Sequence, residues 1–205
     1  ITQSLNSDTD IKLDLGDYNK VRKMIQTTKP FCIINLVGIT DVDHCEKFPK
    51  DAFKVNIQTI NNIVNAIKVS SIQPHLIHIS TDQVYDNKGF CAEENISLSN
   101  YYSFSKYVGE LLASQINSTI LRTNFFGKSK VYLRKSLTDW IYNNLMNKNS
   151  IKVFEDVWFN PLSIYTLCKM ILLTVQRRHK GVFNLGSKDA MNKAEFAIYF
   201  AKILG

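Results

Sequence analysis

The chain has 205 residues, of which 45% are hydrophobic and 21% are charged, and its formal net charge is +7. This composition predicts a globular protein of one domain, or of one domain with a small appended lobe. No apolar run reaches about 18 residues, so no transmembrane helix is expected. The positive residues form no basic block with interleaved aromatics, so the charge argues against a nucleic-acid binder.

In chain order, apolar runs alternate with amphipathic stretches. Asp17 can cap a helix whose apolar face is formed by Val21, Met24 and Ile25. Residues 31–37 (FCIINLV) form a near-continuous apolar run, which predicts a parallel strand buried on both faces. Beyond these, the pattern predicts a short strand or the end of one at 11–15, and strands at 75–80, 118–124, 151–154 and 181–185. It predicts helices at 50–69, 101–116, 131–147, 162–178 and from 192, and the apolar stretch from Ile164 to Val175 is interpreted as a buried amphipathic helix. Strands that alternate with helices predict an α/β protein with a parallel sheet and flanking helices.

Ligands of such sheets bind beyond the carboxyl ends of the strands, so the side chains that follow strands are informative. Ser80, Thr81 and Asp82 directly follow the strand HLIHIS. A hydroxyl at this position can hydrogen-bond a substrate carbonyl oxygen and orient it. The alternative is an ordinary turn that ends a strand.

Tyr102 and Lys106 lie four residues apart on a predicted helix, so their side chains share one face. A nearby ammonium stabilises a phenolate and is expected to lower the pKa of the tyrosine. Such a pair can give a proton to a carbonyl oxygen while hydride reaches the carbon. Taken alone, the spacing also fits a partly exposed helix face.

The cysteines and histidines show no ligand spacing, so no metal site and no disulfide framework are expected. Cys32 and Cys168 stand in apolar runs and are interpreted as core thiols. His75 and His78 lie on a predicted buried strand and are interpreted as core or edge histidines with satisfied hydrogen bonds.

Several segments together resemble the dTDP-4-dehydrorhamnose reductase family, which belongs to the extended short-chain dehydrogenases. HLIHISTDQVYD resembles its strand and STDYVFD segment, and NYYSFSKYVGE resembles its NxYGxSKxxGE helix. CIINLVGITDVDHCE, FKVNIQTINNIVNAI, LDLGDYNKVRKMIQTTKP and LRTNFFG also match family segments in order. The likeness covers about residues 11–127, and FNPLS and GVFNLGS continue it more loosely.

The resemblance assigns roles to individual residues. It implies that Thr81, Tyr102 and Lys106 are catalytic, that Lys106 also holds the nicotinamide ribose, and that Asn56 braces the site. The implied cofactor-binding residues are Asp14, Leu15, Asn35, Leu36, Val37, Gly38, Lys106 and Thr123. The implied substrate-binding residues are Thr81, Asp82, Gln83, Asn124, Phe125 and Asn160. For Asp14 the alternative is a turn cap, and for Asn160 an Asn-Pro turn.

The resemblance also implies a domain organisation. Residues 1–128 would form a partial Rossmann domain that binds NADPH or NADH. Residues 129–205 would form mostly a C-terminal substrate-binding lobe, with some elements that return to the Rossmann domain. No GxxGxxG or GxGxxG occurs, and thirteen residues precede Asp14, so we expect a chain without the first strand, glycine-rich loop and helix.

The function implied is the NAD(P)H-dependent reduction of a 4-keto nucleotide sugar in the cytoplasm, with a homodimer as one option. The alternative is a non-catalytic binding subunit that resembles the beta subunit of methionine adenosyltransferase. A dehydratase or epimerase of the same superfamily is weaker, because Gln83 follows Asp82 where dehydratases place an acid. Gln83, Ser103 and Phe125 replace the family's Tyr, Gly and Trp, which predicts a different sugar specificity.

Overall fold

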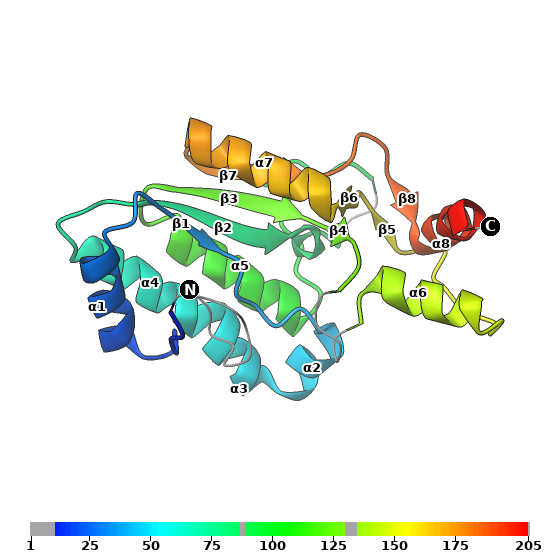
Figure 1. The fold of residues 1–205 in the computed structure, drawn as a ribbon, viewed down its shortest axis with the longest axis horizontal. Helices are drawn as coiled ribbons and strands as arrows, with labels where there is room; N and C mark the ends of the chain where they lie inside the picture. Colours follow the sequence, from blue (N-terminus) through cyan, green and yellow to red (C-terminus); the bar gives the residue numbers. More distant parts are fainter. Residues whose placement is uncertain (1–10, 87–88, 130–134, 205) are drawn as a thin grey trace. The chain divides into compact units, whose positions relative to one another are not determined.

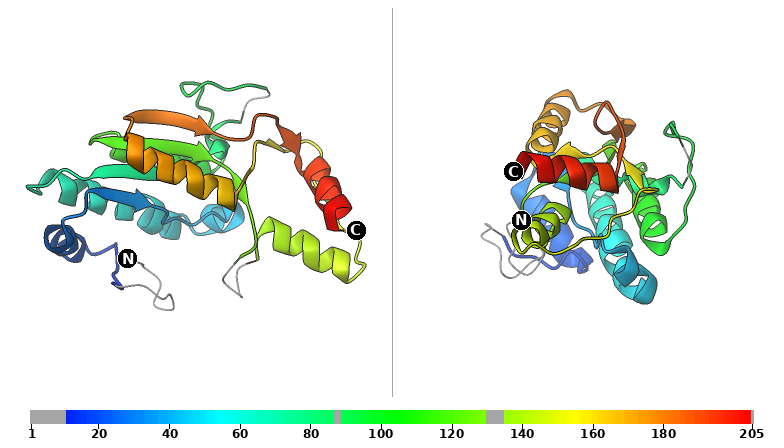
Figure 2. Two further views of the ribbon diagram at one scale, coloured as in Figure 1. Left: turned by 45° about the horizontal axis from the view of Figure 1, so that its top comes forward. Right: turned by 90° about the vertical axis from the view of Figure 1, so that its right-hand side faces the viewer.

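The computed structural model describes residues 11–86, 89–129 and 135–204. Its central element is a parallel sheet of four strands, which run side by side in the order β1-β2-β3-β7 (Figures 1 and 2). The strands are β1 (Cys32–Asn35), β2 (His75–Thr81), β3 (Ser118–Thr123) and β7 (Gly181–Leu185). In the parallel pair β1–β2, Cys32 lies opposite His75 and Asn35 lies opposite His78. The predicted Rossmann-type α/β fold is confirmed.

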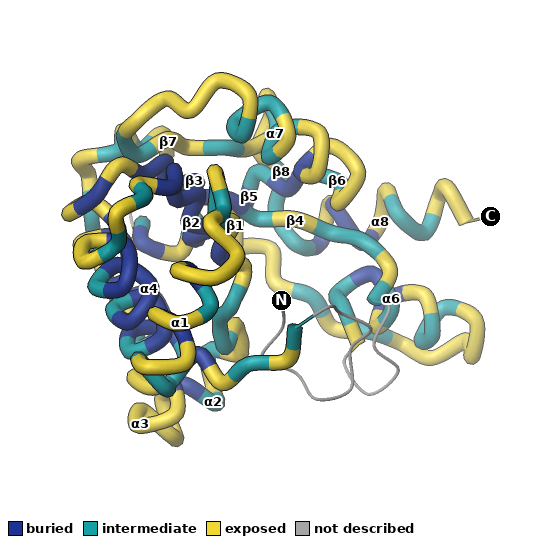
Figure 3. The backbone as a smooth tube through the Cα atoms, turned by 60° about the vertical axis from the view of Figure 1, so that its left-hand side comes forward, coloured by how far each residue is buried: buried dark blue, intermediate teal, exposed yellow. Residues whose placement is uncertain are grey.

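Helices that follow the strands cover one face of this sheet. α5 (Tyr101–Ala113) packs on β2 and on α4 (Thr59–Lys68), and α1 (Tyr18–Thr28) packs on α4 (Figure 1). α1 begins where expected, because the Asp17 carboxylate accepts a hydrogen bond from the Lys20 amide. Every residue of β2 is buried, as the apolar run predicted, and Figure 3 shows the buried backbone gathered along β2, β3 and α4.

The helix predicted at 50–69 is continuous but not uniform. It begins as α3 (Pro49–Ala52), passes through one π-helical segment, η1 (Phe53–Gln58), and continues as α4. A short helix that was not predicted, α2 (Val42–Lys47), precedes it. The widened π turn matters for the site, because Asn56 lies within it.

The chain divides into two compact units, each with its own core. The first comprises residues 1–122 and 174–184, and the second comprises residues 123–173 and 185–205. The second unit contains the parallel pair β4 (Phe125–Phe126) and β6 (Leu162–Ser163), and the antiparallel pair β5 (Trp158–Phe159) and β8 (Met191–Asn192). Its core forms around Ile141, Phe159, Phe196 and Ala197, from β5, α6 (Leu137–Met146) and α8 (Lys193–Leu204).

Three predictions about strands are wrong. β1 lies at the edge of the described sheet and Ile34 is 42% exposed, so this strand is not buried on both faces. In residues 11–15 only Lys12 forms an isolated bridge. Residues 151–154 form no strand, because Ile151 and Val153 pack against the core of the second unit without a strand partner.

Two predictions about burial are also wrong. α7 (Ile164–Arg177) forms where a buried amphipathic helix was expected, but within the described residues only its Leu167 is buried. Cys168 on this helix is exposed and Cys32 is only partly buried, so neither is a core thiol; the buried cysteine is Cys45. Part of the helix predicted at 131–147 lies outside the described residues.

Candidate active site

Thr81 is held at the carboxyl end of β2 by the turn that follows it. Its hydroxyl oxygen accepts a hydrogen bond from the Gln83 amide at 3.2 Å and so caps the short helix η2 (Asp82–Val84). Asp82 and Gln83 continue directly from it, half-buried and exposed respectively. The strand end therefore presents a threonine hydroxyl in a fixed position, although the residue itself is only 4% exposed.

α5 carries Tyr102 and Lys106 and is anchored at its start by a capping box. The Asn100 side chain accepts a hydrogen bond from the Ser103 amide at 2.8 Å, and the Ser103 hydroxyl reaches back to the Asn100 backbone. Ser103, which departs from the resembled family's pattern, therefore has a structural role. Tyr102 and Lys106 lie one turn apart and are each 5% exposed, so the exposed-face alternative is wrong.

Tyr102 and Thr81 converge. Burial raises the pKa of Tyr102 to about 12; a side-chain hydrogen bond with Thr81 opposes this rise, and the charges of Asp82 and Cys45 add to it. The expectation that Lys106 lowers the pKa of this tyrosine is wrong for this structure, because burial dominates. Tyr102 therefore carries its proton throughout the neutral range and is suited to donate it.

Lys106 is a buried ammonium at the same strand end. Its Nζ donates a hydrogen bond to the Ile79 carbonyl oxygen at 2.7 Å. Burial lowers the pKa of Lys106 to about 8, against the opposing influence of the Glu110 carboxylate. An ammonium has three N–H donors, so beyond its bond to Ile79 Lys106 can still donate to a ligand.

Gly38 provides the space in front of this ammonium. A Cβ at Gly38 would lie 3.3 Å from the Asn56 side-chain oxygen and 3.7 Å from Lys106 Nζ. Asn56 is fixed on both sides: its Oδ1 accepts from the Ile39 amide at 2.8 Å and its Nδ2 donates to the Ser105 hydroxyl at 2.8 Å. The end of β1, the π turn and α5 thus meet around Lys106, and the residues present fit a ribose that is bound against its ammonium.

Asn35, at the end of β1, connects this strand end to β2 through its side chain. Its Oδ1 accepts from the Val37 amide, which orients its Nδ2 toward His78 Nδ1 at 3.0 Å. His78 must therefore accept at Nδ1 and carry its proton on Nε2, which has no hydrogen-bond partner among the described residues. His78 is buried as predicted, but its hydrogen bonds are only half satisfied.

Asp14 and Leu15, which the resemblance implies as contacts of the cofactor's adenine, both belong to the first unit. The Asp14 carboxylate accepts from the Gly16 amide at 2.8 Å, as the turn-cap alternative requires, and its side chain is exposed. Leu15 is 6% exposed and packs in the core of the first unit. In the strand-end segment, Leu36 is 66% exposed while Val37 packs partly against this core.

The remaining predicted substrate residues belong to the second unit, together with Thr123. Phe125 is 50% exposed on β4, and Asn124 precedes it. The Asn160 Nδ2 donates to the Ser187 carbonyl oxygen at 3.2 Å, in a close approach to Gly186. Thr123 is buried at the end of β3.

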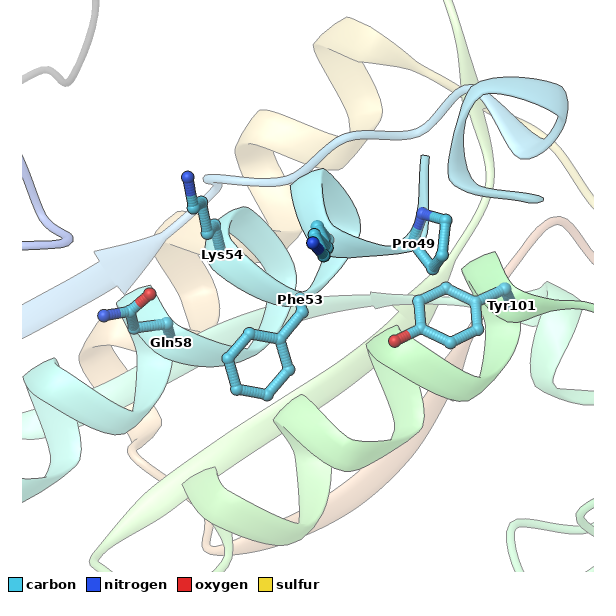
Figure 4. A pocket seen from close by; sticks show the side chains of 6 residues that line it. Pro49, Phe53, Lys54, Gln58 and Tyr101 are labelled. Atoms are coloured by element: carbon cyan, nitrogen blue, oxygen red, sulfur yellow. The ribbon is translucent and has the colours of Figure 1, made fainter. Parts of the chain in front are cut away.

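One described hollow is not lined by Thr81 or Lys106. It has a volume of about 420 Å³ and opens beside α3, η1 and the start of α5, where Phe53 and Tyr101 face it (Figure 4). Its lining contains none of the predicted catalytic residues.

Two charged residues at the site were not singled out from the sequence, Glu110 and Arg122. They form a buried ion pair, with 2.6 Å between Arg122 Nη2 and Glu110 Oε2. An arginine inside the strand STILRTN was the available signal, because a charged residue on a buried strand requires a partner.

A parallel sheet whose strand ends gather a threonine, a buried tyrosine and a buried lysine places the chain among Rossmann-type α/β proteins. More narrowly, the chain belongs to the RmlD substrate binding domain family, whose model matches residues 2–205.

Several individual proteins similar to this chain are named as dTDP-4-dehydrorhamnose reductases. A dTDP-4-dehydrorhamnose reductase of Sinorhizobium fredii is 27% identical over 91% of the chain, and the chain spans 65% of that protein's length. A crystal structure of a hypothetical dTDP-4-dehydrorhamnose reductase from Sulfolobus tokodaii is 31% identical with a TM-score of 0.87, covering 98% of this chain and 71% of that one. The dTDP-4-dehydrorhamnose reductase of Bacillus anthracis, solved in complex with NADP, is 25% identical with a TM-score of 0.84, over 94% and 69% respectively.

Proposed function

We propose that the chain is part of an NAD(P)H-dependent reductase that converts the 4-keto group of a nucleotide sugar into an alcohol. The convergence of Thr81, Tyr102 and Lys106 at one strand end carries this proposal. The dTDP-4-dehydrorhamnose reductases among the relatives support the same reaction class.

Each residue of the triad has a role that follows from its environment. Tyr102 donates its proton to the carbonyl oxygen, since burial keeps the phenol protonated. Thr81 donates a second hydrogen bond to the same oxygen and orients the ketone. The ammonium of Lys106 stabilises the phenolate that Tyr102 becomes and holds the ribose of the cofactor.

NADPH or NADH is the proposed cofactor, in keeping with the NADP bound in the Bacillus anthracis relative. When bound, its nicotinamide supplies the hydride that reaches the carbonyl carbon. Lys106 and Gly38, with Asn35, Leu36, Val37 and Thr123, would hold its nicotinamide half. Asp14 and Leu15 remain the proposed adenine contacts on the resemblance alone.

The second unit is proposed to be the substrate-binding lobe. Asn124, Phe125 and Asn160 would contact the sugar nucleotide from this lobe, and Asp82 and Gln83 from the first unit. A cytoplasmic location and a homodimer are likewise proposals from the resemblance. In the described part of the chain, no helix combines the length and the apolar character that crossing a bilayer requires.

The deciding experiment uses the full-length gene product. Its NADPH and NADH oxidation is followed with a panel of 4-keto nucleotide sugars, in parallel with Tyr102→Phe and, as a matched control on the same helix, Tyr107→Phe. We expect turnover with at least one sugar, a loss of roughly a hundredfold or more in kcat for Tyr102→Phe with unchanged cofactor binding, and no loss for Tyr107→Phe. Absence of NAD(P)H binding, with tight binding to another protein instead, would favour the regulatory-subunit alternative.

A further inference from the structure

The ion pair between Glu110 and Arg122 is nearly sealed from solvent. The side chains are 2% and 3% exposed, and the contact is bidentate. Arg122 Nε lies 3.0 Å from Glu110 Oε1 and 3.1 Å from Oε2, and Nη2 lies 2.6 Å from Oε2. This fork geometry is rigid, since two parallel donors fix both the distance and the plane of the carboxylate.

Through Glu110 the pair reaches the strand that ends in Thr81. The Ser80 hydroxyl donates a hydrogen bond to Glu110 Oε1, and one turn earlier on α5 the Lys106 ammonium donates to the Ile79 carbonyl oxygen. α5 is thus fastened to β2 at Ile79 and at Ser80, the two residues immediately before Thr81. These two bonds determine where Tyr102, on the same helix face, stands relative to the Thr81 hydroxyl.

Through Arg122 the pair reaches the segment that follows Thr81. Arg122 Nη1 donates to the Tyr85 hydroxyl at 2.7 Å and to the Glu93 carbonyl oxygen at 2.6 Å. The Tyr85 hydroxyl in turn donates to Asn184 Oδ1 at 2.7 Å. One arginine therefore connects the catalytic helix with the chain on the far side of Asp82 and Gln83.

Stability is a weak explanation for this network. Desolvation of a buried ion pair costs about as much as the attraction returns, and apolar residues of similar volume often replace such a pair without loss. What apolar residues cannot supply is directional bonding from one carboxylate to a strand-end serine and an arginine at once.

We propose that Ser80, Glu110 and Arg122 form a positioning network that sets the distance between Thr81 and the Tyr102–Lys106 pair. The proposal rests on the reductase function proposed above. None of the three residues touches the reacting groups; they act through Thr81 and α5.

Ser80→Ala is the smallest change that tests the network, since it removes one hydroxyl and leaves the ion pair between Glu110 and Arg122 intact. The matched control is Ser118→Ala on β3, an equally buried serine whose hydroxyl donates to the Ala113 carbonyl oxygen at 2.8 Å. In the full-length gene product we expect both variants to lower Tm equally. Only Ser80→Ala should lower kcat, roughly ten- to a hundredfold, with unchanged NADPH binding, and Ser80→Thr should restore most of it.

A second readout needs no turnover. The Gln83 amide is bonded to the Thr81 hydroxyl oxygen, so its hydrogen exchange reports how firmly Thr81 is held. We expect faster exchange at Gln83 in Ser80→Ala and no change in Ser118→Ala. Equal kcat and equal exchange in the two variants would overturn the network, whereas a wild-type protein that reduces no 4-keto sugar but shows the exchange difference would overturn only the reductase proposal.

Discussion

At the scale of single residues, the site combines two side chains, Tyr102 and Lys106, whose pKa values burial shifts in opposite directions. The pKa of Tyr102 rises to about 12, while the pKa of Lys106 falls to about 8. Burial disfavours the charged form of each, so the phenol keeps its proton to a higher pH and the ammonium releases its proton at a lower pH. The motif spacing predicted that the two side chains meet one face, but it could not predict these shifts, because they depend on the depth at which the helix packs.

This asymmetry predicts the pH dependence of turnover. Tyr102 remains protonated up to about pH 12, whereas Lys106 is charged only below about pH 8. The kcat/KM of the full-length gene product should therefore be flat below pH 8 and fall about tenfold per pH unit above it. A pH series of initial rates measures this, and a profile that stays flat to pH 10 would contradict a required Lys106 ammonium.

A second residue-scale prediction concerns acid stability. Burial lowers the pKa of His78 well below 6.5, with a smaller contribution from the Lys106 charge. Below about pH 6.5 His78 binds a proton in the unfolded chain but not in the folded chain. Its contribution to the free energy of unfolding is therefore fully present above this pH and is lost as the pH falls. We expect a loss of about 1.4 kcal/mol per pH unit from this residue. Denaturant unfolding between pH 7.5 and pH 5 measures it.

The control for that experiment is the exposed His179. Burial also lowers the pKa of His75, so His78→Gln should reduce the acid decline without abolishing it, whereas His179→Gln should leave it as it is in the wild type. An equal slope in all three proteins would mean that His78 is not the responsible group.

At the scale of elements, regular strands and helices with a distinct apolar pattern were predictable, and their local irregularities were not. β2 and the helix that begins after Asp17 appear where the residues place them. The π turn at residues 53–58 could not be predicted, because its apolar spacing matches that of an ordinary helix. Its consequence is the position of Asn56, whose side chain bonds to the Ile39 amide and to the Ser105 hydroxyl. The alternation in residues 151–154 failed as a strand signal, because Ile151 and Val153 pack against the core of the second unit without forming a strand.

The two capping boxes provide an element-scale prediction. Asn100 caps α5, which carries Tyr102 in its first turn, and Ser136 caps α6 in the second unit. Replacing either cap by Ala should cost about 1 kcal/mol in unfolding free energy. Turnover should fall only for Asn100→Ala, since fraying at the start of α5 displaces Tyr102, and parallel measurement of unfolding and kcat separates the two effects. Equal turnover would show that Tyr102 is held by burial alone.

At the scale of the whole molecule, the two units keep separate cores. The cluster around Ile60 and Ile120 draws only on the first unit, and the cluster around Phe196 draws only on the second. Phe196 packs edge-on against Phe126 and Phe159, with ring centroids 5.1 and 5.5 Å apart. The resemblance indicated a second lobe and elements that return to the first domain, but not which ones; residues 174–184 return because β7 pairs with β3.

Separate cores predict separate responses to a cavity. Phe196→Ala should cost about 3–5 kcal/mol in the second unit and expose the amides of α6 and α8 to hydrogen exchange. The amides of β2 and α4 should keep their protection. Ile60→Ala is the reciprocal variant, and a uniform loss of protection in both variants would mean that the chain unfolds as one cooperative body.

Gly109 sets a limit on what the catalytic helix can become. A methyl group there would lie 3.2 Å from the Asn56 carbonyl oxygen and 3.2 Å from His78 Nε2. The π turn and the central strand therefore approach α5 closely at Gly109, and a side chain at this position would have to push one of them back by a few tenths of an ångström. Gly109 lies on the same helix as Lys106, so a methyl group at this crossing would have to be accommodated by a small shift of α5 against η1 and β2, and the hydrogen bond from Lys106 to the Ile79 carbonyl oxygen would register that shift.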